Sequence, residues 1–469
     1  MNINQLVALL SFAALAACGG GGGGGGGGTS APTPAPTPPT GDSCGVVEQK
    51  QFVADVTSSW YLWNDELADV DPADYDTPSA FLDALTAPLS VDQRDQGFSY
   101  VTTRSADETS FTSGAYFGFG FRSTFTDANE YLLVDVFEDS PADLGTLGRG
   151  NQVLAIETDN GFETIAELGA RNASNEEIFG PNEEGIERTF RILDNGQTRD
   201  VTLAKAEVDV PAVARAPRLI ERAGLTSVGY VHFRSFTLNA ADPLDAVFQE
   251  FYDAGISDYV IDLRYNSGGL LSVAEQFLNL LGGDIASGQV SYLLSHNEEH
   301  SDENFSESFV MEPQSVRPLR IAFITTGSTA SASELLINSL TPHVEVILVG
   351  EDTTGKAVGQ YAFDMPDCDT RLRVVSFEIL NGEEMGEYYT GLVDTGRFNF
   401  CAAADDVTRP FGDTQEKSLE TALNWLNGES CSSSVSSQKT AARSKTLVRD
   451  AWELRDAREL PDRRSPHVH

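Results

Sequence analysis

The sequence predicts a multidomain α/β protein with three structural parts: a small N-terminal helical region, a β-rich domain, and an α/β core with a mostly parallel sheet. The length of 469 residues favours two to four domains, and 41% apolar residues are enough for a packed core. Apolar residues recur first at helical spacing, then in short runs between glycine turns. In the last part of the chain, apolar residues form strand-like and helix-like segments in alternation, which indicates parallel strands joined by helices.

The chain is strongly acidic. It carries 71 acidic and 31 basic residues, a formal net charge of −40. Such a charge repels phosphate backbones and anionic lipid headgroups, so we expect no nucleic-acid partner and no electrostatic docking on membranes. The six histidines form no H-E-x-x-H or similar pair, so we expect no metal site and no cofactor.

The N-terminal segment predicts a signal peptide (1–17) and a lipid anchor. Residues 3–17 are apolar but too short to span a bilayer, and the sequence Leu-Ala-Ala-Cys that ends at Cys18 resembles a bacterial lipobox. We expect Cys18 to be lipidated and residues 18–43, rich in Gly and Pro, to form a tether. Gly19, rather than Asp, follows the cysteine. This resembles Gram-negative lipoproteins and implies an outer-membrane lipoprotein of the bacterial cell envelope, facing the periplasm or the cell surface, with membrane contact through the anchor only.

Four further cysteines predict two disulfides, because an even number in an exported protein is typical of disulfide pairing. They are Cys44, Cys368, Cys401 and Cys431. Of the three possible connectivities we favour Cys368–Cys401 and Cys44–Cys431. Metal ligation is the competing interpretation, but no C-x-x-C or paired histidine accompanies these cysteines.

The predicted helical region covers residues 44–110. Residues 46–63 carry four apolar side chains at helical spacing, and residues 79–85 predict a second, short helix. The four side chains are Val53, Val56, Trp60 and Trp63. We expect the tryptophans to lie in the core.

The predicted β-rich domain covers residues 111–208. Its short apolar runs and glycine turns include GFGF at 118–121, SPA at 140–142 and LGRGN at 147–151. In this order the motifs resemble those of a PDZ domain, which binds a free peptide C-terminus by adding the peptide as an extra strand. The resemblance implies that a carboxylate-binding loop is formed by Gly118, Phe119, Gly120 and Phe121. The alternative is a β-bulge without a ligand.

The α/β core is predicted over residues 209–431. Strands are expected at 225–236, 258–263, 320–326 and 344–350. Helices are expected at 272–281 and 331–340, and another from Pro243, after an N-cap at Asp242, up to Gly255. The remaining residues, 432–469, are serine-rich and then basic, and we expect a loosely ordered tail.

Three motifs follow strands of this core, and sites in parallel sheets gather at the carboxyl ends of the strands. Residues 262–269 read DLRYNSGG, residues 327–334 read GSTASASE, and residues 350–360 read GEDTTGKAVGQ. They supply backbone N–H groups, hydroxyls and an amine, respectively. The hydroxyl residues of GSTASASE are either helix caps or include a nucleophile at a helix N-terminus.

In order and spacing, these three motifs resemble those of the C-terminal processing (tail-specific) peptidases, and the resemblance covers residues 44–428. The resemblance implies a ClpP/crotonase-like core, with Ser331 as nucleophile, Lys356 as general base and Gln360 as the residue that orients the lysine. It also implies an oxyanion hole made by the backbone N–H groups of Gly268 and Ala332. The implied substrates are proteins or peptides with free C-termini, and no cofactor is required.

These residue types suit that chemistry. A serine is a poor nucleophile until a positioned base takes its proton, and a lysine does this when burial favours its neutral amine. Serine–lysine pairs are known variants of the serine triad. Gln360 is able to hold the amine by a hydrogen bond but supplies no charge.

Alternatives remain for the same residues. Ser328, Thr329 and Ser333 are expected to be caps or packing residues, and Glu334 a capping or salt-bridging group. The Asn-Ser-Gly-Gly run at 266–269 is similar to a motif of chymotrypsin-like proteases, but the histidine upstream, His232, falls within a predicted strand of an α/β domain. The second functional hypothesis is a non-catalytic lipoprotein that binds peptides or an apolar ligand on the same fold.

Overall fold

The computed structural model describes residues 44–431, apart from residues 113–114, 127 and 217. The predicted signal peptide, the tether with Cys18 and the basic tail therefore lie outside the described residues. The helices and strands all belong to one compact unit. Within the described ranges, no helix is both long and apolar enough to cross a bilayer.

Two helices, α1 (Val46–Trp60) and α2 (Pro78–Val91), form the N-terminal region, with two short 3-10 helices, η1 (Asn64–Glu66) and η2 (Pro72–Asp74), between them. Helix α2 begins where the Thr77 hydroxyl accepts a hydrogen bond from Ala80 N at 3.1 Å, with a proline at the first helical position. Trp60 and Trp63, which were predicted to lie in the core, are partly buried and pack against an apolar cluster.

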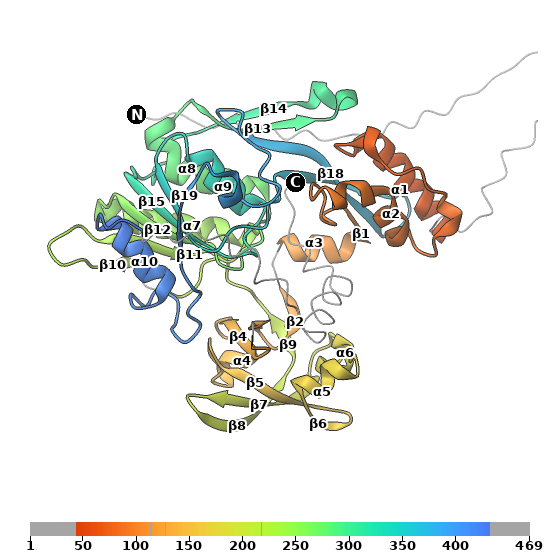
Figure 1. Ribbon diagram of the computed structural model, residues 1–469, viewed down its shortest axis with the longest axis horizontal. Coiled ribbons are helices and arrows are strands. Elements are labelled where there is room, and N and C mark those ends of the chain that lie inside the picture. Colours follow the sequence, from red (N-terminus) through yellow and green to blue (C-terminus); the bar gives the residue numbers. More distant parts are fainter. Residues whose placement is uncertain (1–43, 113–114, 127, 217, 432–469) are drawn as a thin grey trace, which may run out of the picture. The chain divides into compact units, whose positions relative to one another are not determined.

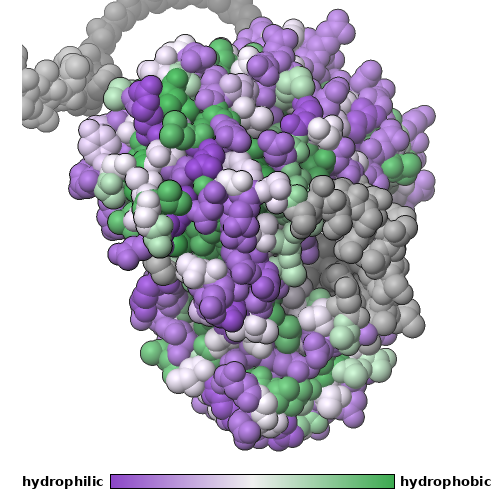
Figure 2. Space-filling model, turned by 60° about the vertical axis from the view of Figure 1, so that its left-hand side comes forward, coloured by the Kyte–Doolittle hydropathy of each residue, from purple (hydrophilic) through white to green (hydrophobic). Residues whose placement is uncertain are grey.

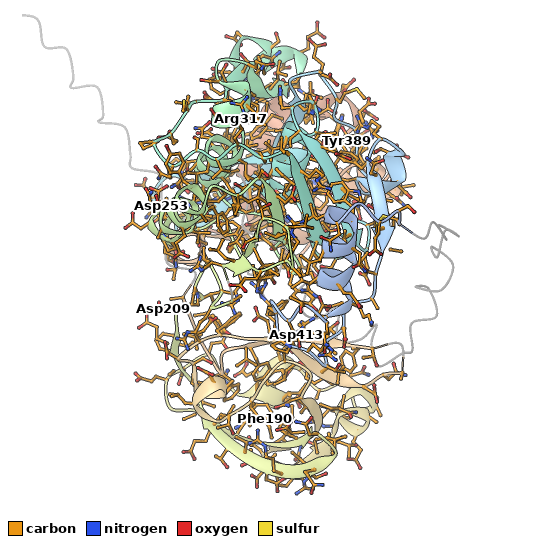
Figure 3. The ribbon with its side chains drawn as sticks, turned by 90° about the vertical axis from the view of Figure 1, so that its left-hand side faces the viewer. Phe190, Asp209, Asp253, Arg317, Tyr389 and Asp413 are labelled. Carbon is orange, nitrogen blue, oxygen red and sulfur yellow. A yellow bond between two sulfur atoms is a disulfide. The ribbon has the colours of Figure 1, made fainter. Side chains whose placement is uncertain are left out.

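A six-stranded antiparallel sheet, which we call the small sheet, has the order β3-β4-β5-β7-β8, with β6 paired to β5. Its strands are β3 (Phe121–Phe125), β4 (Tyr131–Val136), β5 (Gln152–Thr158), β6 (Gly161–Thr164), β7 (Glu187–Asp194) and β8 (Gln197–Ala204). Its helices are α4 (Pro141–Leu144), α5 (Ile165–Ala170) and α6 (Asn175–Phe179). Phe190 of β7 is fully buried in the apolar core of this sheet (Figure 3).

The main sheet has the order β10-β11-β12-β15-β16-β19 (Figure 1). Only the pair β10–β11 is antiparallel, and the other four pairs are parallel. Its strands are β10 (Leu219–Ile220), β11 (Val228–His232), β12 (Asp258–Asp262), β15 (Arg320–Thr325), β16 (Glu345–Gly350) and β19 (Asn399–Ala402). The expected strand at 225–236 is therefore shorter in the structure.

Helices cover both faces of the main sheet. Ile261 and Phe323 face the helices α7 (Ala241–Ala254), α8 (Leu271–Ala286) and α9 (Ala332–Leu340), whereas their neighbours Val260 and Ile324 face α10 (Lys417–Leu426). Successive strand residues point to opposite faces, so a sheet covered on both faces has strands that are apolar throughout. Three 3-10 helices complete this part: η3 (Leu238–Ala240), η4 (Glu298–Glu303) and η5 (Val393–Thr395).

A further antiparallel sheet, with the order β1-β18-β13-β14 and β17 paired to β18, is absent from the sequence-based prediction. Its strands are β1 (Tyr100–Thr103), β13 (Val290–His296), β14 (Phe305–Ser308), β17 (Val358–Asp364) and β18 (Thr370–Asn381). Helices α1 and α9 both contact β18. A short pair, β2 (Tyr116–Gly118) with β9 (Ala206–Val208), follows α3 (Arg104–Thr112). Because β1 and its partner β18 are far apart in the sequence, no local sequence pattern predicts this sheet.

The predicted disulfide pairing is wrong. The structure pairs Cys44 with Cys368 and Cys401 with Cys431, with Cα–Cα distances of 5.6 and 5.5 Å. Cys44 directly precedes α1, which packs on β18, and Cys368 lies in the turn before β18. Cys401 is on the edge strand β19, and Cys431 follows α10, which packs on the same sheet. Tertiary packing therefore decides the pairing.

Hydrophilic side chains are spread over the surface, with apolar side chains scattered between them, on the face shown in Figure 2. This distribution agrees with the large excess of acidic residues in the sequence.

Candidate active site

Ser331 lies at a sharp turn between β15 and α9. Its backbone has φ 55° and ψ −117°, and it is the N-cap residue of α9. A positive φ is uncommon for a residue other than glycine and costs about 1–3 kcal/mol, so the surrounding structure must hold this turn in place. The side chain is fully buried, and no hydrogen-bond partner of its Oγ lies within the described residues.

Glu334 ties the serine turn to the lysine loop. Its carboxylate accepts hydrogen bonds from Ser331 N at 2.9 Å, Gly355 N at 2.8 Å and Lys356 N at 2.8 Å. Burial raises the pKa of the Glu334 carboxyl to about 7, although the hydrogen bonds that it accepts oppose this rise. The capping role expected from the sequence is present, and the same carboxylate places the backbones of Ser331 and Lys356 side by side.

Lys356 is 2% exposed, and its amine donates a hydrogen bond to Gln360 Oε1 at 2.6 Å. Burial lowers the pKa of this amine to about 7. Gln360 is on β17, and its Nε2 donates to the Phe98 carbonyl oxygen at 2.5 Å. The lysine therefore has a neutral hydrogen-bond acceptor in a dry environment, which favours a neutral amine near pH 7.

The glycine-rich turn after β12 packs directly against the serine. Gly268 has φ 107°, and a Cβ built on it would lie 2.8 Å from Ser331 Cβ and 2.9 Å from Ala332 N. No larger residue fits there. The Gly268 N–H donates to Asn266 Oδ1 at 2.9 Å, so this N–H is engaged within the turn in this structure. The assignment of Gly268 and Ala332 to an oxyanion hole stays a prediction.

The neighbouring hydroxyls have structural partners. Thr329 Oγ1 donates to Leu263 O at 2.8 Å, and Ser333 Oγ donates to Asn266 O at 3.0 Å. Both residues connect the serine turn to the glycine-rich turn. They are the structural hydroxyls that the sequence analysis expected.

His232 is not paired with a serine. It is fully buried and stacks on Phe411 with ring centroids 3.8 Å apart. Within the described residues, neither ring nitrogen has a hydrogen-bond partner, and burial lowers the pKa of the imidazole well below its ordinary value. A chymotrypsin-like arrangement around residues 266–269 is therefore absent from the described part of the chain. No group of His, Cys, Asp and Glu side chains there is placed to hold a metal ion.

The GFGF segment joins β2 to β3. Gly120 has φ 89°, and a Cβ on it would meet Ser140 Oγ at 2.2 Å, so the turn requires glycine. Among the described strands, β3 pairs only with β4, which leaves it at an edge of the small sheet. An edge strand has backbone groups available for an added peptide.

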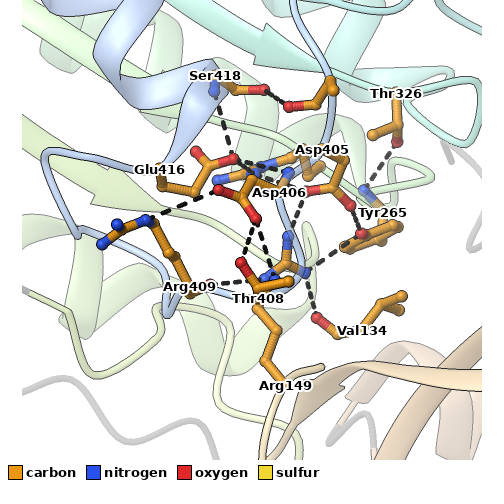
Figure 4. Close-up of polar contacts among 12 residues, drawn as sticks. Val134, Arg149, Tyr265, Thr326, Asp405, Asp406, Thr408, Arg409, Glu416 and Ser418 are labelled. Carbon is orange, nitrogen blue, oxygen red and sulfur yellow. Dashed lines mark hydrogen bonds and ion pairs between the residues drawn. The ribbon is translucent and has the colours of Figure 1, made fainter. Parts of the chain in front are cut away.

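Partly and fully buried charged side chains connect the small sheet to the main sheet (Figure 4). The guanidinium of Arg149 contacts the Asp405 carboxylate, which also accepts hydrogen bonds from the Tyr265 hydroxyl and, at 2.7 Å, from Arg264. Arg264 also forms an ion pair of 2.6 Å with Asp262, the last residue of β12. Because Tyr265 begins the glycine-rich turn, this network reaches the residues that surround the serine.

The sequence analysis missed two residues at or near the site. One is Phe98, which contacts both Lys356 and Gln360 but is 262 residues away from Gln360 in the sequence. The other is Asp405, which belongs to no motif. Neither has a local sequence signal, because only the packing of distant segments brings them to the site.

Together, the fold and the site define an α/β protein with a serine of positive φ at a strand–helix turn. A buried lysine follows on a loop whose backbone N–H shares the Glu334 carboxylate with that of the serine. Residues 227–386 match the family described as Peptidase family S41, and residues 48–100 match the Peptidase S41 N-terminal domain. These two segments of the chain are thus similar to peptidase family S41.

The chain is also similar to named relatives and to a solved structure. A carboxyl-terminal-processing protease of Synechocystis sp. is 28% identical over 260 residues, which are 55% of this chain and 56% of that protein. The carboxyl-terminal-processing peptidase 1, chloroplastic, of Arabidopsis thaliana is 28% identical over 233 residues, 49% of this chain and 44% of that protein. The chain thus spans about half the length of these curated relatives.

The crystal structure of a putative S41 protease from Bacteroides fragilis has a TM-score of 0.64 and 24% identity, and it covers 80% of this chain and 97% of that one. This likeness shows a shared fold.

Proposed function

We propose that the protein is a serine endopeptidase in which Ser331 is the nucleophile and Lys356 the general base. The observation that carries this proposal is the buried Lys356 amine, whose hydrogen-bond acceptor at 2.6 Å is a neutral amide and whose pKa is about 7. A base whose pKa lies near the operating pH accepts and returns a proton efficiently.

In the acylation step, the neutral Lys356 amine takes the proton of Ser331 Oγ as Oγ attacks the carbonyl carbon of a peptide bond. The carbonyl oxygen becomes an oxyanion, and fixed N–H donors lower the energy of this charge. When the C–N bond breaks, the ammonium of Lys356 gives its proton to the leaving nitrogen, and an acyl-enzyme ester remains on Ser331.

In the deacylation step, Lys356 takes a proton from water, and the resulting hydroxide attacks the ester carbon. The C–O bond to Ser331 breaks, and Lys356 returns its proton to Oγ. Gln360 accepts a hydrogen bond from the amine throughout and thereby directs it. Two N–H groups are the predicted oxyanion donors. Ala332, which carries one of them, is the first residue of α9. The N–H group of Gly268 must break its hydrogen bond to Asn266 Oδ1 before it is able to donate to the oxyanion.

We further propose that residues 111–208 form a PDZ-like domain that binds the free C-terminal tail of a protein substrate. The edge strand β3 and the turn at 118–121 support this proposal, since a peptide is able to pair with β3 while its carboxylate meets the N–H groups of the turn. We also assign residues 44–110 to the N-terminal region and residues 209–431 to a ClpP/crotonase-like core.

The same proposal places the protein in the bacterial cell envelope as an outer-membrane lipoprotein anchored through Cys18. The Leu-Ala-Ala-Cys sequence and the Gly/Pro-rich segment after it support this location. The two disulfides support it as well, because disulfides persist in oxidising compartments.

The test uses the purified chain and unfolded proteins that differ only in their last residues. We expect cleavage by the wild type and a loss of several orders of magnitude in kcat for Ser331→Ala, with an unchanged Tm. Tails that fail to bind the PDZ-like domain are expected to raise KM. If wild type and Ser331→Ala behave alike on every substrate, the enzyme proposal is wrong, and a non-catalytic binding function takes its place.

A further inference from the structure

The segment between α2 and β1 lies against the lysine and the glutamine. We call residues 95–99 the Asp95 loop; α2 and β1, which flank it, lie beside β18 in Figure 1. Phe98 makes both contacts: its carbonyl oxygen accepts from Gln360 Nε2 at 2.5 Å, and its ring centroid lies 5.2 Å from Lys356 Nζ. The loop falls inside the segment that matches the N-terminal domain of the family, not inside the peptidase segment.

A buried carboxylate sets the shape of this loop. Asp95 is fully buried and accepts hydrogen bonds from Phe98 N at 2.6 Å, Ser99 Oγ at 2.8 Å and Tyr61 OH at 3.0 Å. Ser99 Oγ in turn accepts from Val375 N of β18 at 3.1 Å. A buried carboxylate is stable only when it is well hydrogen-bonded, so these contacts hold the loop in one conformation.

The loop decides which end of the Gln360 amide faces the lysine. An amide has a donor end and an acceptor end, and its Nε2 donates here to the Phe98 carbonyl oxygen. Oε1 must therefore face Lys356. If the amide were reversed, its N–H groups would point at the amine and compete for the lone pair that takes the serine proton.

We propose that the Asp95 loop is a positioning element of the active site, which holds the Gln360 amide in its productive orientation and shields the Lys356 amine from water with the Phe98 ring. This inference rests on the proposed serine–lysine chemistry. The charged groups that face Lys356 are Asp95 of the loop, Arg373 of β18 and Glu334 of α9. Arg373 is itself paired with a carboxylate of α3.

The first test changes the ring and leaves the carbonyl in place. In Phe98→Ala, water reaches the amine, so we expect the acid limb of the pH profile of kcat/KM to move up by about one pH unit, because a hydrated lysine has a higher pKa. The conservative variant Phe98→Leu is expected to keep the limb of the wild type. A limb that stays in place in both variants overturns the shielding role.

The second test changes the carboxylate. In Asp95→Asn, the loss of a negative charge that faces the amine is expected to move the acid limb to lower pH, while KM changes less than threefold. The matched control is Asp92→Asn, which removes an exposed charge three residues earlier and is expected to leave the limb unchanged. An unmoved limb in Asp95→Asn, or equal shifts in both variants, overturns the inference even if Phe98→Ala fails to fold.

A third measurement separates this inference from the proposed function. The pKa of Lys356 is measured by NMR titration of 13C-labelled lysine in the Ser331→Ala background, which needs no activity. We expect the same directions of change for Phe98→Ala and Asp95→Asn. A wild type without Ser331-dependent cleavage refutes the proposed function, whereas active wild type with an unmoved lysine pKa in both variants refutes only the positioning role of the loop.

Discussion

Two buried basic residues of this protein, Lys356 and Arg264, are almost equally inaccessible to water, at 2% and 0% exposure, but have different hydrogen-bond acceptors. Lys356 donates to the neutral amide of Gln360, and burial lowers the pKa of its amine. Burial also lowers the pKa of Arg264, but the carboxylates of Asp262 and Asp405 hold that pKa well above its ordinary value.

The difference shows that burial alone does not decide whether a base is charged. A carboxylate partner stabilises the cation and makes an ion pair that holds elements together, whereas an amide partner offsets less of the desolvation cost and favours the neutral base. The first arrangement connects the small sheet to the main sheet, and the second prepares a proton acceptor. Three changes test this contrast.

The largest effect is expected from Lys356→Arg. Arginine stays protonated at all accessible pH values, so it cannot accept the serine proton. We expect kcat to fall by about 10²–10⁴-fold, the usual contribution of a general base. A cation beside a neutral amide is also expected to lower the Tm. Steady-state kinetics and thermal unfolding measure both effects, and more than a tenth of wild-type activity would show that Lys356 is not the base.

A smaller but still large effect is expected from Asp405→Asn, which leaves Arg149 and Arg264 with one carboxylate fewer. Breaking a buried ion pair in this way lowers the free energy of unfolding by about 3 kcal/mol. The control Lys417→Ala removes an exposed pair with Glu420 and is expected to leave the Tm unchanged. The acid limb of kcat/KM should not move in Asp405→Asn, because Asp405 is not among the groups that act on Lys356.

The smallest of the three effects is expected from Gln360→Glu, which gives Lys356 the kind of partner that Arg264 has. A carboxylate at hydrogen-bond distance raises the pKa of an amine by roughly 1–3. The neutral amine is the active form, and its fraction falls as pH falls through its pKa of about 7, so a raised pKa moves the acid limb to higher pH. At pH 6 we expect kcat/KM to fall about tenfold whenever the acid limb moves up by one pH unit.

The matched control for Gln360→Glu is Gln360→Ala, which removes the orienting acceptor without adding charge. We expect Gln360→Ala to lower kcat, and we expect the acid limb of its kcat/KM profile to lie at lower pH than that of Gln360→Glu. The contrast between amide and carboxylate partners is contradicted if Gln360→Glu and Gln360→Ala have the same pH profile.

The sequence alone determined the parts of the protein that depend on local patterns. The alternation of apolar strands and helices was sufficient for the α/β core, since a sheet covered on both faces needs strands that are apolar throughout. The resemblance of GSTASASE and GEDTTGKAVGQ to motifs of the C-terminal processing peptidases pointed to Ser331, Lys356 and Gln360, whose catalytic roles stay predictions. The structure brings the lysine and the glutamine into contact.

Only the tertiary structure determined the contacts between segments that are far apart in the sequence. The antiparallel sheet unites strands that are far apart in the sequence, and the disulfides follow the packing of α1 on β18 and of α10 on the main sheet. The same holds for Phe98 and Asp405, whose neighbours are far away in the sequence. Desolvation and pairing depend on what surrounds a group in space, so the charge state of Lys356 is a property of the folded protein, and the lysine motif alone does not specify it.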